Sequence, residues 1–292
     1  MDFVIFVVSS MVISVALGTL LHLQFGLTGI VNFGVVGFWG VGMYTMGVLL
    51  VDFEVPYLVA LAAATLASGL LAFVLGRLIL DLDGQAILVA TLAFATIVLY
   101  LVTTEKWLTG GVIGLGTVPF PFDAGRSTEL LFLGVLVVLA AALIWYARRV
   151  RLQPYGRLLI GIRENEPLAR SLGKPTFRQK LVLFTITSAG MGFFGALSGS
   201  LNQFLVPRML EPALTFTIWI ALIVGGRKHP LGALIGVIVT VGLFDLVIET
   251  LAPIPETYAQ LIPNLKLMIY GLTLIVVMTF RPQGIMGDGK RS

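Results

Sequence analysis

The chain has 292 residues, of which 58% are hydrophobic and only 12% are charged, with a net charge of +4 and no cysteine. A soluble domain usually carries about 25% charged residues, so this composition excludes an ordinary water-soluble protein. The lack of cysteine in this sequence also excludes a disulfide framework and a thiolate metal site. The composition therefore indicates an integral membrane protein.

Long apolar runs follow one another along almost the whole chain. A membrane-spanning helix needs about 20 mostly apolar residues, because lipid cannot hydrogen-bond the backbone. Nine candidate spans are predicted, at 3–21, 27–51, 56–79, 86–104, 130–147, 181–204, 213–226, 231–251 and 263–280. We expect the first to be retained, because it lacks the pattern of a signal peptide. The predicted fold is an all-α, polytopic transmembrane helix bundle of about nine spans, some broken or re-entrant, in one domain over 1–292.

The second apolar run and the residues before it are rich in glycine, with seven glycines between positions 24 and 47. In lipid, so many glycines favour close helix packing or a broken helix. Four polar side chains lie within or beside this stretch: Gln24, Thr28, Asn32 and Thr45. Two interpretations stay open. These groups either hold helices together or contact a substrate in a water-filled path.

A loop rich in glycine and proline is predicted at 105–129, on the outer side of the membrane. It has four glycines between 110 and 116 and prolines at 119 and 121. Such a loop is bent, and it either folds over the outer mouth of the bundle or is an inert connection.

The stretch 148–180 carries nine of the nineteen basic residues of the chain. These are Arg148, Arg149, Arg151, Arg157, Arg163, Arg170, Lys174, Arg178 and Lys180. Because positive charge concentrates in cytoplasmic loops, we expect this stretch to be cytoplasmic and the N-terminus to lie outside. With nine spans, Arg77, the basic pair at 227–228 and the tail after 280 fall on the same side.

A short helix of about two turns is predicted within this loop, over 166–172. Asn165 or Glu166 suits its N-cap, Pro167 suits its first turn, and Gly173 suits the position just past its end.

One face of this predicted helix is apolar, since Leu168 and Leu172 are four residues apart, while Arg170 can pair with Glu166. An isolated helix this short is not stable in water. It therefore needs a socket in the membrane domain, in a partner or in both, unless its helix propensity is incidental.

Charged groups at mid-membrane depth are few, and Asp245 in the eighth run is the main exception. It either lines a water path or pairs with a polar neighbour. A zwitterion could instead be held by amides, hydroxyls and helix-end dipoles. The sequence has no G-x-x-x-x-G-K-[ST] phosphate loop and no cluster with metal-ligand spacing or a nucleophile elbow, which argues against an ATPase or another enzyme.

Segment 153–197, QPYGRLLIGIRENEPLARSLGKPTFRQKLVLFTITSAGMGFFGAL, resembles the signature loop of Liv-type branched-chain amino acid permeases, which are subunits of bacterial ABC importers. The segments at 23–45, 105–119, 225–239 and 280–287 resemble further motifs of this family, in order along the chain. At 226–230 the chain departs from the family, because GRKHP stands where many members have a GxG-type turn followed by GP.

The resemblance implies that the chain is a permease domain whose short helix docks in a cleft of a separate ATPase. The implied ATPase-coupling residues are Arg163, Glu164, Asn165, Glu166, Leu168, Arg170, Leu172 and Gly173. A substrate path would include Gln24, Thr28, Asn32, Thr45 and Asp245.

The resemblance also implies an assembly. The expected partners are two ATP-binding subunits, a homologous second permease and an extracytoplasmic substrate-binding protein, which would dock on 105–129 and 204–212. ATP and Mg²⁺ would be bound by the ATPases, so no cofactor, metal or nucleic acid is expected on this chain. The expected location is the bacterial or archaeal cytoplasmic membrane. The alternatives are a related importer for urea, short amides or other amino acids, and an ATP-independent carrier or channel.

Overall fold

The computed structural model describes residues 3–116, 118–121, 126–226, 231–243, 268, 271–273, 275–276, 279 and 284–286. The elements are α1 (Phe3–His22), the π-helical turn η1 (Leu23–Thr28), α2 (Val35–Val51), α3 (Tyr57–Ile79), α4 (Gly84–Thr104), α5 (Lys106–Thr109), the 3₁₀ turn η2 (Gly111–Ile113), α6 (Arg126–Leu152), α7 (Pro154–Glu164), α8 (Glu166–Ser171), α9 (Thr176–Asn202), the 3₁₀ turn η3 (Pro207–Leu210), α10 (Ala213–Gly225), α11 (Gly232–Val237) and the π-helical turn η4 (Ile238–Leu243). Since every named element of these residues is a helix or helical turn, the all-α prediction is confirmed.

Six helical segments of the described residues are long and apolar enough to cross a membrane. They are Phe3–Thr28, Tyr57–Ile79, Gly84–Thr104, Ser127–Leu152, Thr176–Asn202 and Pro207–Gly225. The chain is therefore a multi-pass membrane protein, but the predicted count of nine spans is not confirmed. Two predicted spans are shorter helices here, at Val35–Val51 and Gly232–Gly242. The ninth predicted span, 263–280, lies mostly outside the described residues.

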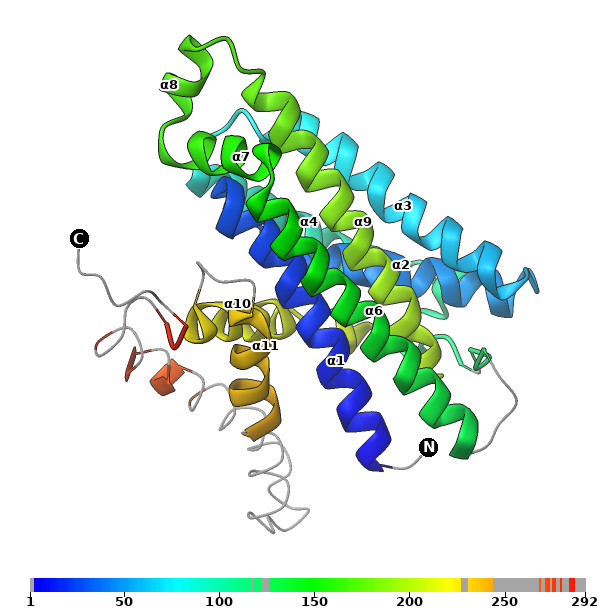
Figure 1. Ribbon diagram of the computed structural model, residues 1–292. Coiled ribbons are helices and arrows are strands. Elements are labelled where there is room, and N and C mark those ends of the chain that lie inside the picture. Colours follow the sequence, from blue (N-terminus) through cyan, green and yellow to red (C-terminus); the bar gives the residue numbers. More distant parts are fainter. Residues whose placement is uncertain are drawn as a thin grey trace.

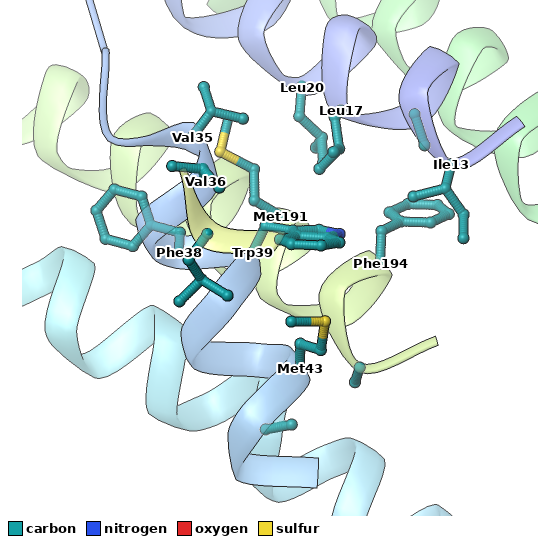
Figure 2. Packing of buried hydrophobic residues seen from close by; sticks show 14 of the residues in the cluster. Ile13, Leu17, Leu20, Val35, Val36, Phe38, Trp39, Met43, Met191 and Phe194 are labelled. Carbon is teal, nitrogen blue, oxygen red and sulfur yellow. The ribbon is translucent and has the colours of Figure 1, made fainter. Parts of the chain in front are cut away.

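The core of the bundle lies where α2 and α9 pack against α1 and α3. Figure 2 shows Leu17, Trp39, Met191 and Phe194 meeting where α1, α2 and α9 come together. By contrast, α3, α4 and α6 keep most of their apolar surface exposed. Apolar helices with exposed apolar side chains are suited to contact lipid.

Helices α2 and α9 touch backbone to backbone. A Cβ atom added to Gly42 would lie 1.9 Å from the carbonyl oxygen of Gly192, and one added to Gly195 would lie 1.9 Å from that of Trp39. No side chain fits at such distances, so these glycines let the two helices cross in contact. For this part of the glycine-rich stretch, the prediction of close helix packing is confirmed.

The predicted span 27–51 is not one continuous helix. The chain leaves η1 at Gly29, whose φ is 75°, and α2 begins only at Val35. A left-handed conformation is easy for glycine and costly for other residues, so Gly29 ends the first helix. The broken helix that the glycines favoured as one possibility is therefore present, although its position cannot be read from hydropathy, which does not depend on backbone conformation.

The predicted loop 148–180 is largely helical. Helix α6 extends to Leu152, beyond the predicted end at 147, and α9 already begins at Thr176. Figure 1 shows α7 and α8 together at one end of the bundle, where α9 begins and α1 ends. The end of α3, with Arg77, lies at this same end, which agrees with the predicted grouping of basic residues. The pair Arg227 and Lys228 lies outside the described residues.

At the opposite end, the two segments expected to form a docking surface are joined. Leu115 and Leu205 form an antiparallel bridge with N–O distances of 2.9 and 2.8 Å, and the Val118 amide donates to the Gln203 carbonyl at 2.9 Å. The loop after α4 is therefore bent and fixed to the turn after α9.

Candidate functional site

Helix α7 packs along the surface of the bundle, directly before α8. Its residues Gly156, Leu159 and Ile162 are buried. Leu159 belongs to a small cluster that also contains residues of η1, α6 and α9. No helix was predicted over 154–164, although Tyr155, Leu159 and Ile162 follow the i, i+4, i+7 spacing of an amphipathic helix.

Helix α8, Glu166–Ser171, ends one residue before the predicted end at 172. The Asn165 side chain caps it by accepting a hydrogen bond from the Leu168 amide at 3.0 Å. Pro167 lies in its first turn, and Gly173 follows with a φ of 74°. Short-range sequence rules place both ends of this helix.

One face of α8 points away from the protein. Leu168 is 55% exposed and Leu172 is 69% exposed, while Ala169 on the other face is buried. The side chain of Glu164, just before α8, is 68% exposed. Leu168 on this six-residue helix and Leu172 directly after its end form an exposed apolar knob, which we call the α8 knob.

The inner face of α8 is tied to the bundle through Lys180. This lysine is 6% exposed, and its Nζ donates to Glu166 Oε2 at 2.9 Å and to the carbonyl oxygen of Leu80 at 3.0 Å. A buried ammonium group needs such partners, because burying an unpaired charge is costly. One side chain of α9 therefore links the first turn of α8 to the end of α3.

Arg170 adds a second set of contacts on the same side. Its guanidinium lies 3.0 Å from Glu166 Oε1 and 3.8 Å from Asp81 Oδ1, and its Nε donates to Thr176 Oγ1 at 3.2 Å. The predicted pair between Arg170 and Glu166 is present, and it belongs to a network that reaches α3 and α9.

Burial and the neighbouring cations shift the pKa of the Glu166 carboxyl group in opposite directions. Partial burial alone would raise its pKa, but the hydrogen bonds from Lys180 and Arg170 and the charge of Lys180 outweigh burial. The net pKa of Glu166 is lowered, so the carboxylate is charged at neutral pH.

Arg163, at the end of α7, points toward the bundle. Its Nη1 donates to the carbonyl oxygen of Gly26 in η1. A Cβ atom added to Gly29 would lie 3.0 Å from Cγ of Arg163, so the side chain lies against the break as well. The predicted coupling residues are thus close together but face two ways: Glu164, Leu168 and Leu172 point outward, Arg163 and Glu166 point inward, and Arg170 stays exposed while it pairs with Glu166.

Three of the predicted path residues form one buried network at the break. Gln24 Nε2 donates to Thr187 Oγ1 at 2.7 Å and to Ser188 Oγ at 3.2 Å, while Gln24 Oε1 accepts from Asn32 Nδ2 at 2.8 Å. Thr28 Oγ1 donates to the Gln24 carbonyl at 2.6 Å. Gln24 and Asn32 are fully buried, so these groups bond to one another and to α9 rather than to solvent.

Side chains from distant helices satisfy the non-helical backbone beside this network. Trp219 Nε1 donates to the carbonyl oxygen of Asn32 at 2.9 Å, and Thr91 Oγ1 accepts from the Phe33 amide at 2.9 Å. Backbone that is not helical at membrane depth requires such partners, because lipid supplies none. These contacts favour the packing interpretation of Gln24, Thr28 and Asn32.

The remaining predicted path residues lie elsewhere. Thr45 is partly buried and lines an apolar cavity of about 620 Å³ between α2, α3 and α4, with Tyr44 and Phe94. Asp245 lies outside the described residues.

Comparison with known proteins gives consistent matches over most of the chain. A sequence model of the family described as "Branched-chain amino acid transport system / permease component" matches residues 2–278. The high-affinity branched-chain amino acid transport system permease protein LivM of Salmonella typhimurium is 29% identical over 94% of this chain and 68% of its own length. The Escherichia coli LivM is 28% identical over the same fractions, and the probable LivM of Methanocaldococcus jannaschii is 23% identical over 92% of this chain and 88% of its own length. No solved structure gives a significant match. The chain belongs to the permease-component family of branched-chain amino acid transport systems.

Proposed function

We propose that this chain is the membrane-spanning permease subunit of an ATP-driven ABC importer. With a second, homologous permease it forms the alternating-access path for branched-chain or similar small amino acids. Membership of the permease family and the names of the LivM relatives support the substrate class.

The observation that carries the coupling part of this proposal is the α8 knob. Leu168 and Leu172 project from a helix that is too short to be stable by itself and is held only on its inner face. An exposed apolar knob on an anchored base is suited to a cleft in a partner. In this proposal the partner is an ATPase subunit, which also binds ATP and Mg²⁺, and this chain holds no cofactor.

The inner contacts supply a route for movement from the knob into the bundle. Lys180 connects Glu166 to the end of α3, and Arg163 connects α7 to η1, just before the break at Gly29. A displacement of α8 by the ATPase would therefore be transmitted through these contacts to α3, α9 and the broken segment at the same time. Alternating access requires elements of this kind with two arrangements.

The rest of the assembly follows from this arrangement. The end with α7 and α8 faces the cytoplasm of a bacterial or archaeal cell, in agreement with its basic residues. The surface around Leu115 and Leu205, at the opposite end, faces the extracytoplasmic substrate-binding protein. Its neighbours Ile113 and Phe204 are exposed and available for contact.

The first experiment is purification of the chain from its native membranes, followed by reconstitution in liposomes. An ATPase subunit and a second permease should co-purify, and uptake of L-leucine should require ATP. Uptake by the chain alone without ATP would contradict the importer and support a carrier or channel. Transport of urea or acetamide but not leucine would contradict the proposed substrate class and support an importer for urea or short amides.

The second experiment tests the knob. Leu168→Asp should reduce the substrate-stimulated ATPase rate of the assembled importer by about tenfold or more, since it places a charge at the centre of an apolar contact. Glu164→Ala should reduce it less. Leu152→Asp, at a leucine that is even more exposed, at the same end but outside α8, is the matched control and should retain the rate. Equal rates for Leu168→Asp and Leu152→Asp would exclude the knob as the coupling contact.

A further inference from the structure

A second cavity, of about 220 Å³, lies between α1, α2, α9 and the segment that leads into α10. Its lining residues are Ser10, Ile13, Ser14, Leu17, Trp39, Ser198, Asn202, Met209 and Leu214. They come from the middle of α1, the first two turns of α2, the last two turns of α9 and the segment from η3 into α10, so the cavity lies beside the middle of α1 and the end of α9 that is away from α8. None of them was predicted as a path residue.

The indole N–H of Trp39 has no hydrogen-bond partner within the described part of the chain. Trp39 is only 6% exposed, and Figure 2 shows its ring between Leu17 and Met43, with the nitrogen on the side of Phe194 and Ile13. A buried donor without an acceptor costs about 1–3 kcal/mol. The nitrogen itself has almost no accessible surface, so an acceptor that arrives with a ligand reaches it only when a side chain beside it shifts.

Further polar groups around the cavity are available as well. Asn202 uses its Nδ2 to donate to the carbonyl oxygen and hydroxyl of Ser198, at 2.8 and 3.2 Å. Ser14 donates to the Ser10 carbonyl at 2.9 Å. Among the described residues, these bonds leave the Asn202 Oδ1 acceptor, the Ser198 hydroxyl proton and the Ser10 hydroxyl unused.

The lining combines two kinds of surface. Its donors and acceptors are all uncharged, and the rest of the wall is aliphatic, with Ile13, Leu17 and Leu214. A zwitterion has a carboxylate that accepts hydrogen bonds and an ammonium group that donates them. An ion with a net charge would find no counter-charge on this wall, whereas a small neutral zwitterion would find both kinds of partner.

We propose that this cavity is a substrate subsite for a small zwitterionic amino acid with an aliphatic side chain. The Trp39 N–H and the Ser198 hydroxyl bind the carboxylate, Asn202 Oδ1 accepts from the ammonium group, and Ile13, Leu17 and Leu214 surround the side chain. The inference rests on the proposed function and adds a place for the substrate, beside the end of α9 that is away from α8.

The sequence has no cysteine, so one introduced thiol is the only thiol of this chain. Ser198→Cys puts it on the cavity wall, and Asp52→Cys, at the exposed turn after α2, is the control. In the complete importer in nanodiscs, L-leucine should slow labelling of Ser198→Cys by a methanethiosulfonate reagent at least about threefold, and should not slow labelling of Asp52→Cys. Equal protection of both sites, or of neither, overturns the subsite.

A second variant tests the role of the indole nitrogen. In the Ser198→Cys background, Trp39→Phe should raise the leucine concentration that half-protects the thiol about fivefold, the usual range for one lost hydrogen bond. Trp145→Phe, an exposed tryptophan on α6, should leave that concentration unchanged. If Trp39→Phe fails to assemble, the protection of Ser198→Cys in the parent decides alone.

The proposed function has a test that is independent of this subsite. It is tested by ATP-dependent leucine uptake of the unmodified importer, a measurement that uses no variant of the cavity. Uptake without protection of Ser198→Cys would retain the importer and discard this subsite.

Discussion

The ammonium nitrogen of Lys180 lies 2.9 Å from Glu166 Oε2, and it also donates to the Leu80 carbonyl at 3.0 Å. Lys180 is on α9, Glu166 opens α8, and Leu80 follows α3, so one buried cation connects three segments. This arrangement means that α8 is not a free appendage of the bundle. Its position is fixed by contacts with α9 and with the end of α3.

Lys180→Met should weaken this connection. The substitution keeps much of the apolar stem but removes the donor of the Leu80 carbonyl and one of the two cationic partners of Glu166, which keeps Arg170, at a cost of about 2 kcal/mol in the free energy of unfolding. Substrate-stimulated ATPase activity of the importer should fall while ATPase binding persists. The exposed Lys174→Met is the matched control and should change neither quantity. Full coupling in Lys180→Met would show that α8 does not depend on this anchor.

Acidification should loosen α8. The pKa of Glu166 is lower in the folded protein than its ordinary value of 4.5, so its carboxylate stabilises the fold above that pH. This stabilisation is lost as the pH falls below 4.5 and through the folded pKa. Amide hydrogen exchange of 166–172 at pH 6 and at pH 3.5 measures the effect. The increase in opening on acidification should be smaller in Glu166→Gln, and an equal increase would assign it to other groups.

The polar network at the break allows the two interpretations of Gln24 to be separated. Gln24→Leu removes an acceptor for Asn32 and a donor to Thr187 inside the bundle, so the unfolding free energy should fall by about 2 kcal/mol. The packing interpretation expects this loss together with reduced amounts of assembled protein. Normal stability combined with a raised KM for leucine would instead identify Gln24 as a substrate contact. Thr96→Val, on the exposed side of α4, is the control.

Helix α8 could be placed from the sequence because its signals are local. Asn165 and Gly173 act within a few residues of the helix ends, and their effect does not depend on the rest of the fold. These local signals do not predict which way each side chain of the region points. Arg163 was grouped with the residues that contact a partner, yet its guanidinium bonds to Gly26, 137 positions away.

The network of Gln24 could not be predicted for the same reason. Its partners Thr187 and Ser188 are more than 160 residues away, and no short-range pattern connects them. The glycines of this stretch predicted a broken helix as one possibility, but hydropathy alone does not show that the break is at 29–34, before α2. Trp39 was not predicted as a path residue, since a tryptophan in an apolar run is ordinarily a packing residue.

The crossing of α2 and α9 predicts that glycine-to-alanine substitution changes stability in opposite directions at two sites. Gly42→Ala would place a methyl group 1.9 Å from the Gly192 carbonyl oxygen, so the helices must separate, at a cost of about 2–3 kcal/mol. Gly134→Ala, on the exposed side of α6, meets nothing within 4 Å and should stabilise its helix by about 0.5–1 kcal/mol. Thermal unfolding of the two variants in the same detergent compares them. Equal midpoints would mean that α2 and α9 do not touch at Gly42, and that the core has a different packing in the membrane.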